Sequence, residues 1–130
     1  MTDAEKPPEA RTRILVAEDD PALAEMLKWL LTREGFEPLH AADGMSALAL
    51  ARQEKPALIL SDVMLPKMDG FKFCRLVKFD AELKHIPFLF LTARTQDKDR
   101  ETALQAGADE YVTKPIPNAD FVKVIRKHLG

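Results

Sequence analysis

Three short, uninterrupted apolar runs constrain the fold of this chain more than any other feature of its sequence. They are ILVA at residues 14–17, ALIL at residues 57–60 and FLFL at residues 88–91. A strand with one solvated face alternates polar and apolar residues, whereas a parallel strand covered on both faces is apolar throughout. Because segments with helical periodicity separate the runs, the pattern predicts a parallel sheet with helices on both faces.

Two further segments complete the predicted strands, which are residues 14–17, 36–40, 57–61, 88–91 and 110–112. Pro38 lies in the second segment. Because proline has no N–H to donate to a central ladder, we expect that strand at an edge of the sheet.

Helix signals occupy the intervals between the strands and follow the last one. Asp20 before Pro21 predicts an N-cap followed by a first-turn proline, and Asp43 and Asp69, each before a glycine, predict two more helix starts. A fourth helix is expected over residues 99–106, where Gly107 would end it, and a last one carries the apolar stripe Phe121, Val124, Ile125 and Leu129. The alternation predicts a (βα)5 architecture with right-handed crossovers.

Length and composition fit one domain with a substantial core, since 46% of the 130 residues are hydrophobic. We expect polar residues 1–12 to form a flexible N-terminal leader and residues 13–130 to form the domain. A formal charge of −2 argues against direct nucleic-acid binding. The single cysteine, Cys74, excludes an internal disulfide and a cysteine-rich zinc site. Because no apolar run approaches the roughly 20 residues of a membrane span and no secretory signal is evident, we expect a cytoplasmic domain without membrane contact.

Polar side chains follow the central strands, and in open parallel sheets ligands bind beyond the carboxyl ends of the strands. The second strand ends without an obvious chemical group, and the three histidines lack the spacing of a metal pair. Each polar residue has a structural explanation when taken alone, such as a helix cap, a loop acid or a surface lysine. Together they predict a cluster of reactive side chains at one rim of the sheet. The residues that follow the strands there are Glu18-Asp19-Asp20, Ser61-Asp62, Thr92-Ala93 and Thr113-Lys114-Pro115.

The acids of this rim require a counter-charge if Glu18, Asp19 and Asp62 converge. Two like charges about 4 Å apart repel by about 4 kcal/mol at an effective dielectric constant of about 20. Oxygen ligands without a His or Cys cluster favour Mg²⁺ (or Mn²⁺) over zinc. Together with Lys114 and the hydroxyl of Thr92, such a site suits phosphoryl transfer to an aspartate.

Four motifs then match a known family, in order and with similar spacing: ILVAEDDP, ALILSDVMLPKMDG, FLFLTA and YVTKP. On these motifs, residues 13–130 resemble the receiver domain of two-component response regulators. The resemblance implies a flavodoxin-like, doubly wound parallel sheet with strand order 2-1-3-4-5.

The resemblance also implies a role for each matching residue. Asp62 would be the phosphoacceptor, with Lys114 paired to the phosphoryl group. The implied Mg²⁺ ligands are Asp62, Asp19, the backbone carbonyl of Met64 and, through water, Glu18. The remaining implied roles are Thr92 as switch hydroxyl, Tyr111 as switch aromatic, Gly70 as a structural turn residue and Pro115 as the second residue of a cis peptide bond.

A phosphorylation switch is the function that the resemblance implies. A sensor histidine kinase or phosphotransfer protein would supply the phosphoryl group, Thr92 would move inward, and Tyr111 would fill the vacated space. The surface of the fourth helix, fifth strand and fifth helix would then change for an output domain or a downstream partner. Hydrolysis at Asp62 would reset the switch, so the chain is not expected to be an enzyme in the turnover sense. Homodimerisation stays open.

Three alternatives are weighed against this function. A phosphorylation-independent scaffold or dimerisation module of the same fold is expected to lose the aspartate, lysine or acidic pair, and none is lost here. A flavodoxin-like cofactor carrier needs a Ser/Thr/Gly-rich phosphate loop after the first strand, where this chain has three acids and a proline. A metal-dependent phosphatase is compatible with the chemistry, but no substrate-covering insertion is visible. Arg94, at a position that tunes dephosphorylation in the family, is interpreted as a solvated side chain rather than a phosphoryl shield.

Overall fold

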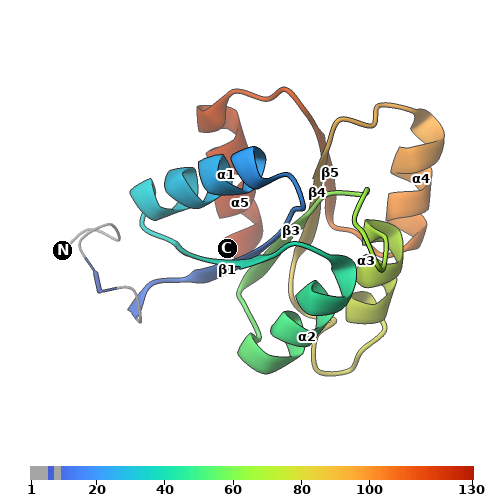
Figure 1. The fold of residues 1–130 in the computed structure, drawn as a ribbon, viewed down its shortest axis with the longest axis horizontal. Helices are drawn as coiled ribbons and strands as arrows, with labels where there is room; N and C mark the ends of the chain where they lie inside the picture. The colour runs from blue at the N-terminus through green and yellow to red at the C-terminus, as the bar shows by residue number, and fades with distance from the viewer. Residues whose placement is uncertain (1–5, 8–9) are drawn as a thin grey trace.

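Five parallel strands form the centre of the computed structural model, which describes residues 6–7 and 10–130 (Figure 1). Their order in the sheet is β2-β1-β3-β4-β5, as expected, and β2, which contains Pro38, lies at an edge. The strands are β1 (Arg13–Ala17), β2 (Glu37–Ala41), β3 (Leu58–Ser61), β4 (Phe88–Thr92) and β5 (Glu110–Thr113).

Helices cover both faces of the sheet (Figure 1). One apolar cluster joins α1 and α5 to one face, and a second joins α2, α3 and α4 to the other. Successive strand residues alternate between the clusters, so Ile14 faces α1 and α5 whereas Leu15 faces the other layer. This double coverage explains the uninterrupted apolar runs. The helices are α1 (Pro21–Arg33), α2 (Gly44–Glu54), α3 (Gly70–Lys78), α4 (Asp97–Gln105) and α5 (Asn118–Leu129).

The predicted N-caps of the first three helices are confirmed. Asp20, Asp43 and Asp69 each accept a hydrogen bond from a backbone N–H of the first helical turn, at 3.0, 2.7 and 2.9 Å respectively. The predicted start of α4 at Asp99 is wrong by two residues. Asp97 begins the helix and Asp99 lies in its first turn, where both carboxylates face the positive end of the helix dipole. Gly107 follows α4 with a φ of +96°, as a helix-ending glycine does.

The register of the sheet fixes the position of the polar rim. Ala17 on β1 pairs with Ser61 on β3, so Glu18 and Asp62 leave the sheet from adjacent strands. Thr92 on β4 pairs with Thr113 on β5, so Lys114 follows at the same edge. The acids and the lysine are therefore brought together by parallel pairing, although up to 96 residues separate them in the chain.

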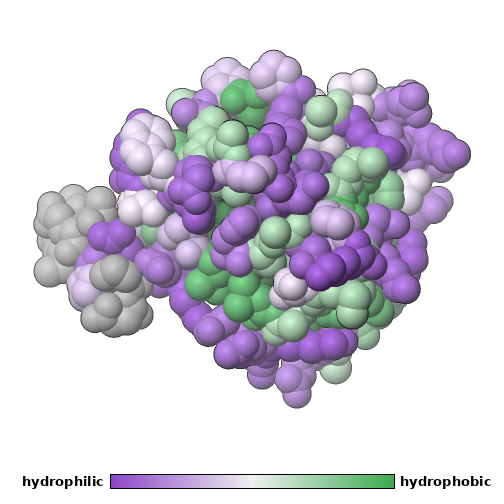
Figure 2. All heavy atoms as spheres, in the orientation of Figure 1, coloured by the Kyte–Doolittle hydropathy of each residue, from purple (hydrophilic) through white to green (hydrophobic). Residues whose placement is uncertain are grey.

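The surface of the molecule mixes hydrophilic residues with smaller apolar areas on the face drawn in Figure 2. Trp29 on α1 is exposed, whereas Cys74 on α3 is fully buried and its Sγ hydrogen-bonds to the Ala106 carbonyl. Within residues 6–7 and 10–130, no helix is both long and apolar enough to cross a bilayer. The expected flexible leader includes residues 1–5 and 8–9, which lie outside the described residues.

Candidate functional site

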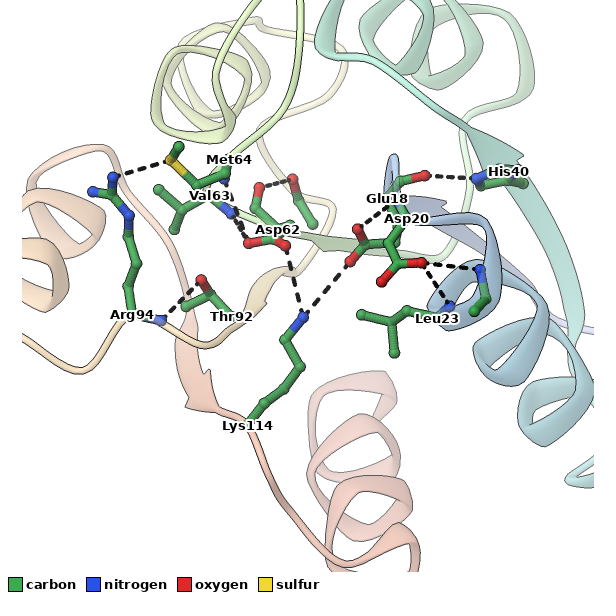
Figure 3. Close-up of polar contacts among 12 residues, drawn as sticks. Glu18, Asp20, Leu23, His40, Asp62, Val63, Met64, Thr92, Arg94 and Lys114 are labelled. Atoms are coloured by element: carbon green, nitrogen blue, oxygen red, sulfur yellow. Dashed lines mark hydrogen bonds and ion pairs between the residues drawn. The ribbon is translucent and has the colours of Figure 1, made fainter.

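Lys114 stands between two carboxylates at the carboxyl edge of the sheet (Figure 3). Its Nζ lies 3.8 Å from Oε1 of Glu18 and 3.7 Å from Oδ2 of Asp62. Three loops supply these groups, after β1, β3 and β5. The predicted meeting of Glu18, Asp62 and Lys114 is therefore confirmed in the structure, with the ammonium group bridging the two acids.

Glu18 is the most buried acid of the site, with only 3% of its surface exposed. Its Oε2 accepts a hydrogen bond from the backbone N–H of Asp20 at 3.0 Å. Burial raises the pKa of Glu18 to about 7, and the charge of Asp62 adds to the rise, whereas the Asp20 N–H and Lys114 oppose it. Burial, rather than the balance of neighbouring charges, is thus the main cause of the raised pKa of Glu18.

The two carboxylate oxygens of Asp62 have different surroundings. Oδ1 accepts hydrogen bonds from the backbone N–H groups of Val63 at 2.7 Å and Met64 at 3.4 Å. Oδ2 faces Lys114 and has no backbone donor among the described contacts. This arrangement fixes the carboxylate while leaving one oxygen toward the rim. Gly70 supports it, because a Cβ at that position would overlap the Asp62 carbonyl oxygen.

Asp19 does not join the other two acids. Its side chain is exposed, and among the described residues no group of three or more His, Cys, Asp or Glu side chains is close enough to hold a metal ion. The three acids therefore do not form such a group in this structure, although the charge of Asp19 contributes to the raised pKa of Glu18. The donor chemistry still fits Mg²⁺, since the carboxylates and the Met64 carbonyl are all oxygen ligands.

Thr92 and Tyr111 both hydrogen-bond to the backbone of Arg94, in the loop after β4. The Oγ1 of Thr92, a buried side chain, accepts a hydrogen bond from the Arg94 N–H at 3.3 Å. The hydroxyl of Tyr111 donates to the Arg94 carbonyl at 2.9 Å. The Tyr111 ring is only 8% exposed and lies 6.0 Å from the ring of Phe90, and burial raises the pKa of its hydroxyl. The aromatic ring is thus already inward while the Thr92 hydroxyl contacts this loop.

Arg94 is tied down at both ends of its guanidinium group. Nη1 pairs with Asp99 at 3.0 Å, and Nη2 donates to the Sδ of Met64 at 3.0 Å (Figure 3). Arg94 is exposed, in keeping with its interpretation as a solvated side chain, and it also pairs with a carboxylate in the first turn of α4. The sequence did not predict this ion pair. Arg94 and Asp99 are five residues apart, which is not a spacing at which side chains meet on a regular helix or strand.

The end of β2 also contributes to the site, although its sequence showed no obvious chemical group. His40 Nε2 lies 2.8 Å from the backbone carbonyl of Glu18 (Figure 3). The two residues are 22 positions apart, so no spacing pattern reveals the contact. On the opposite side of the rim, the peptide bond between Lys114 and Pro115 is cis.

Residues 14–126 match the response regulator receiver domain family. The chain is a receiver domain of a two-component response regulator. Receiver domains are phosphoacceptors that bind Mg²⁺ in their active site. The matched residues include all four motifs on which the sequence resemblance rests.

Relatives and solved structures agree with the receiver family. The chain is 43% identical to the DNA-binding response regulator MtrA of Mycolicibacterium smegmatis, over 92% of this chain and 51% of that protein. It is 41% identical to the phosphate regulon transcriptional regulatory protein PhoB of Klebsiella pneumoniae, over 88% of this chain and 50% of that protein. The receiver domain thus spans about half the length of these relatives.

One similar solved structure is the receiver domain of a Pseudomonas aeruginosa sensor histidine kinase, which has magnesium coordinated in its active-site cleft. It is 30% identical to this chain with a TM-score of 0.87, and the match covers 93% of this chain and 99% of that one. The chemotaxis protein CheY4 of Vibrio cholerae is also 30% identical, with a TM-score of 0.85, over 91% of this chain and 98% of that one. Both similarities extend over more than nine-tenths of this chain.

Proposed function

We propose that this receiver domain accepts a phosphoryl group on Asp62 from the phosphohistidine of a sensor histidine kinase or a phosphotransfer protein. The observation that carries the proposal is the asymmetry of the Asp62 carboxylate. Backbone N–H groups hold Oδ1, whereas Oδ2 faces the rim beside Lys114. A nucleophile needs this combination of a fixed carboxylate and a free oxygen.

In the proposed reaction, Oδ2 of Asp62 attacks the phosphorus atom of phosphohistidine. The new P–O bond forms as the P–N bond breaks, and the bonding electron pair leaves with the histidine nitrogen. Lys114 lies 3.7 Å from the attacking oxygen, so its ammonium group can stabilise negative charge on the transferred phosphoryl oxygens. Thr92 retains a hydroxyl proton to donate, since its oxygen accepts from Arg94.

The oxygen ligands for Mg²⁺ (or Mn²⁺) would be Asp19, Asp62 and the Met64 carbonyl, with Glu18 acting through water. When bound, the ion supplies positive charge to the phosphoryl oxygens. Two observations support this assignment. The donors contain only oxygen, and the negative charges of Asp62 and Asp19 add to the rise that burial causes in the pKa of Glu18, so the three acids interact electrostatically. Binding requires the exposed Asp19 side chain to turn toward the other acids.

The proposed switch runs through the loop after β4. When Thr92 turns toward the phosphoryl group, its hydroxyl leaves the Arg94 N–H, and the hydrogen bond from Tyr111 to the Arg94 carbonyl transmits the movement to β5. The α4-β5-α5 surface then changes for an output domain or a partner protein. Water attack on phosphorus breaks the P–O bond and restores the Asp62 carboxylate with release of inorganic phosphate.

This function describes a cytoplasmic switch that acts on itself and turns over no other substrate. MtrA is a DNA-binding response regulator and PhoB is a transcriptional regulatory protein. We propose that an output domain of that kind, or a separate partner, reads the switch. The receiver domain itself would not contact nucleic acid, in keeping with its formal charge of −2.

Incubation with acetyl phosphate and Mg²⁺, followed by intact-mass measurement, tests the proposal. We expect the mass of one phosphoryl group to be added, no addition in EDTA, and none in Asp62→Asn. Asp97→Asn, at an exposed carboxylate on α4, is the matched control and should label normally. No labelling of the wild type would support the scaffold alternative, whereas unchanged labelling of Asp62→Asn would mean that a residue other than Asp62 is modified.

A further inference from the structure

The edge strand β2 reaches the acidic loop through one side chain. His40 pairs in register with Val16 of β1, and its ring extends past the end of that strand to the Glu18 backbone (Figure 3). Nε2 lies 2.8 Å from the Glu18 carbonyl oxygen. Because a carbonyl oxygen can only accept, Nε2 carries the proton and donates in this contact.

A second hydrogen bond ties the same residue to β2. The backbone N–H of Glu18 donates to the Ala41 carbonyl at 3.0 Å. The N–H and the C=O of Glu18 are thus both bound by consecutive residues of one strand. Its carboxylate is fixed in turn by the Asp20 N–H. Hydrogen bonds from β2 therefore fix both peptide units of Glu18, and with them the direction in which the backbone leaves β1.

We infer that His40 is a positioning residue that orients the Glu18-Asp19 pair for the divalent ion of the phosphorylation site; this rests on the proposed function. His40 would touch neither the ion nor the phosphoryl group. It acts through the Glu18 carbonyl, on the peptide unit that joins the two acids. The backbone beyond Glu18 sets the direction in which the Asp19 side chain leaves the chain, so a hydrogen bond to this peptide unit can influence the position of the Asp19 carboxylate.

Packing offers little competing reason for a histidine at this position. His40 is exposed and belongs to neither apolar cluster. Its loss should therefore leave the core intact and affect the acidic loop locally. A net hydrogen-bond contribution of about 0.5–1.5 kcal/mol corresponds to a roughly two- to tenfold change in an equilibrium constant, which sets the expected size of the effect.

Three variants of the full chain distinguish the loss of the hydrogen-bond donor at position 40 from the loss of the side chain itself. His40→Leu removes the donor, His40→Gln replaces it by an amide N–H₂ group, and His85→Leu removes an exposed histidine elsewhere as a matched control. Mg²⁺ dissociation constants are measured by amide chemical shifts in NMR titrations with magnesium chloride alone. Ring ¹⁵N shifts of His40 and amide hydrogen exchange of Glu18 and Asp20 are measured in metal-free protein.

We expect His40→Leu to weaken Mg²⁺ binding about two- to tenfold and to speed exchange of the Glu18 and Asp20 amides. His40→Gln should restore both, and His85→Leu should change neither. Neutral His40 should show the Nε2–H tautomer. Equal Mg²⁺ affinity in His40→Leu and wild type, or equal loss in His40→Gln and His40→Leu, would overturn the inference while leaving the proposed function intact. Absence of Mg²⁺ binding by the wild type would overturn both.

Discussion

Replacement of Glu18 by glutamine should make the metal-free domain more stable at high pH. Burial raises the pKa of Glu18 from 4.5 to about 7. For an acid with a raised folded-state pKa, the unfolded state releases its proton first. The stabilising contribution is therefore complete below pH 4.5 and is lost as the pH rises through about 7. At about 1.4 kcal/mol per pH unit, the rise from 4.5 to about 7 amounts to about 3–4 kcal/mol.

The amide side chain of the Glu18→Gln variant cannot ionise, but its oxygen can still accept the hydrogen bond that the Asp20 N–H donates to Glu18. In EDTA, the free energy of unfolding of Glu18→Gln should therefore lack the decline that the wild type shows between pH 4.5 and about pH 7. Urea denaturation followed by circular dichroism measures both curves. Glu101→Gln, at an exposed carboxylate on α4, is the control and should follow the wild type. Parallel curves for Glu18→Gln and wild type would refute the reasoning.

Three further substitutions test other parts of the site. Lys114→Met removes the cation that lies 3.8 Å from Glu18 and 3.7 Å from Asp62, so Mg²⁺ should bind more tightly. Labelling by acetyl phosphate should become slower. Weaker Mg²⁺ binding in a calorimetric titration would contradict this. Gly70→Ala places a Cβ against the Asp62 carbonyl oxygen, so urea denaturation should show a loss of about 1–3 kcal/mol, and wild-type stability would argue against the close approach. Tyr111→Phe keeps the buried ring but loses the hydrogen bond to the Arg94 carbonyl, so unfolding should require about 0.5–1.5 kcal/mol less, whereas a larger loss would mean that the ring itself had moved.

The sheet was predictable because its determinants are local. Each continuous apolar run is a strand covered on both faces, and Pro38 alone was enough to place β2 at the edge. The aspartate caps of α1, α2 and α3 depend on side chains and N–H groups only two or three residues apart. The start of α4 was less predictable from sequence, because its residue before the helix, Gln96, makes no side-chain capping bond.

Only the part of the candidate site that depends on the parallel strand register was predictable from the sequence. Glu18, Asp62 and Lys114 meet because each follows the end of a paired strand. The orientation of Asp19 follows the path of a loop, which no periodic pattern specifies. The contact of His40 with the Glu18 backbone depends on side-chain reach between chain segments 22 residues apart. Such contacts become visible only with three-dimensional coordinates.

The identity of the modified residue is the most direct test of the proposed phosphorylation site. Wild-type protein treated with acetyl phosphate and Mg²⁺ is reduced with borohydride, which converts an aspartyl phosphate into homoserine, and the peptides are then sequenced by mass spectrometry. We predict homoserine at residue 62, with the aspartates at positions 19, 20 and 69 unmodified. Homoserine at another aspartate, or at none under conditions that label a known receiver domain, would contradict the proposal.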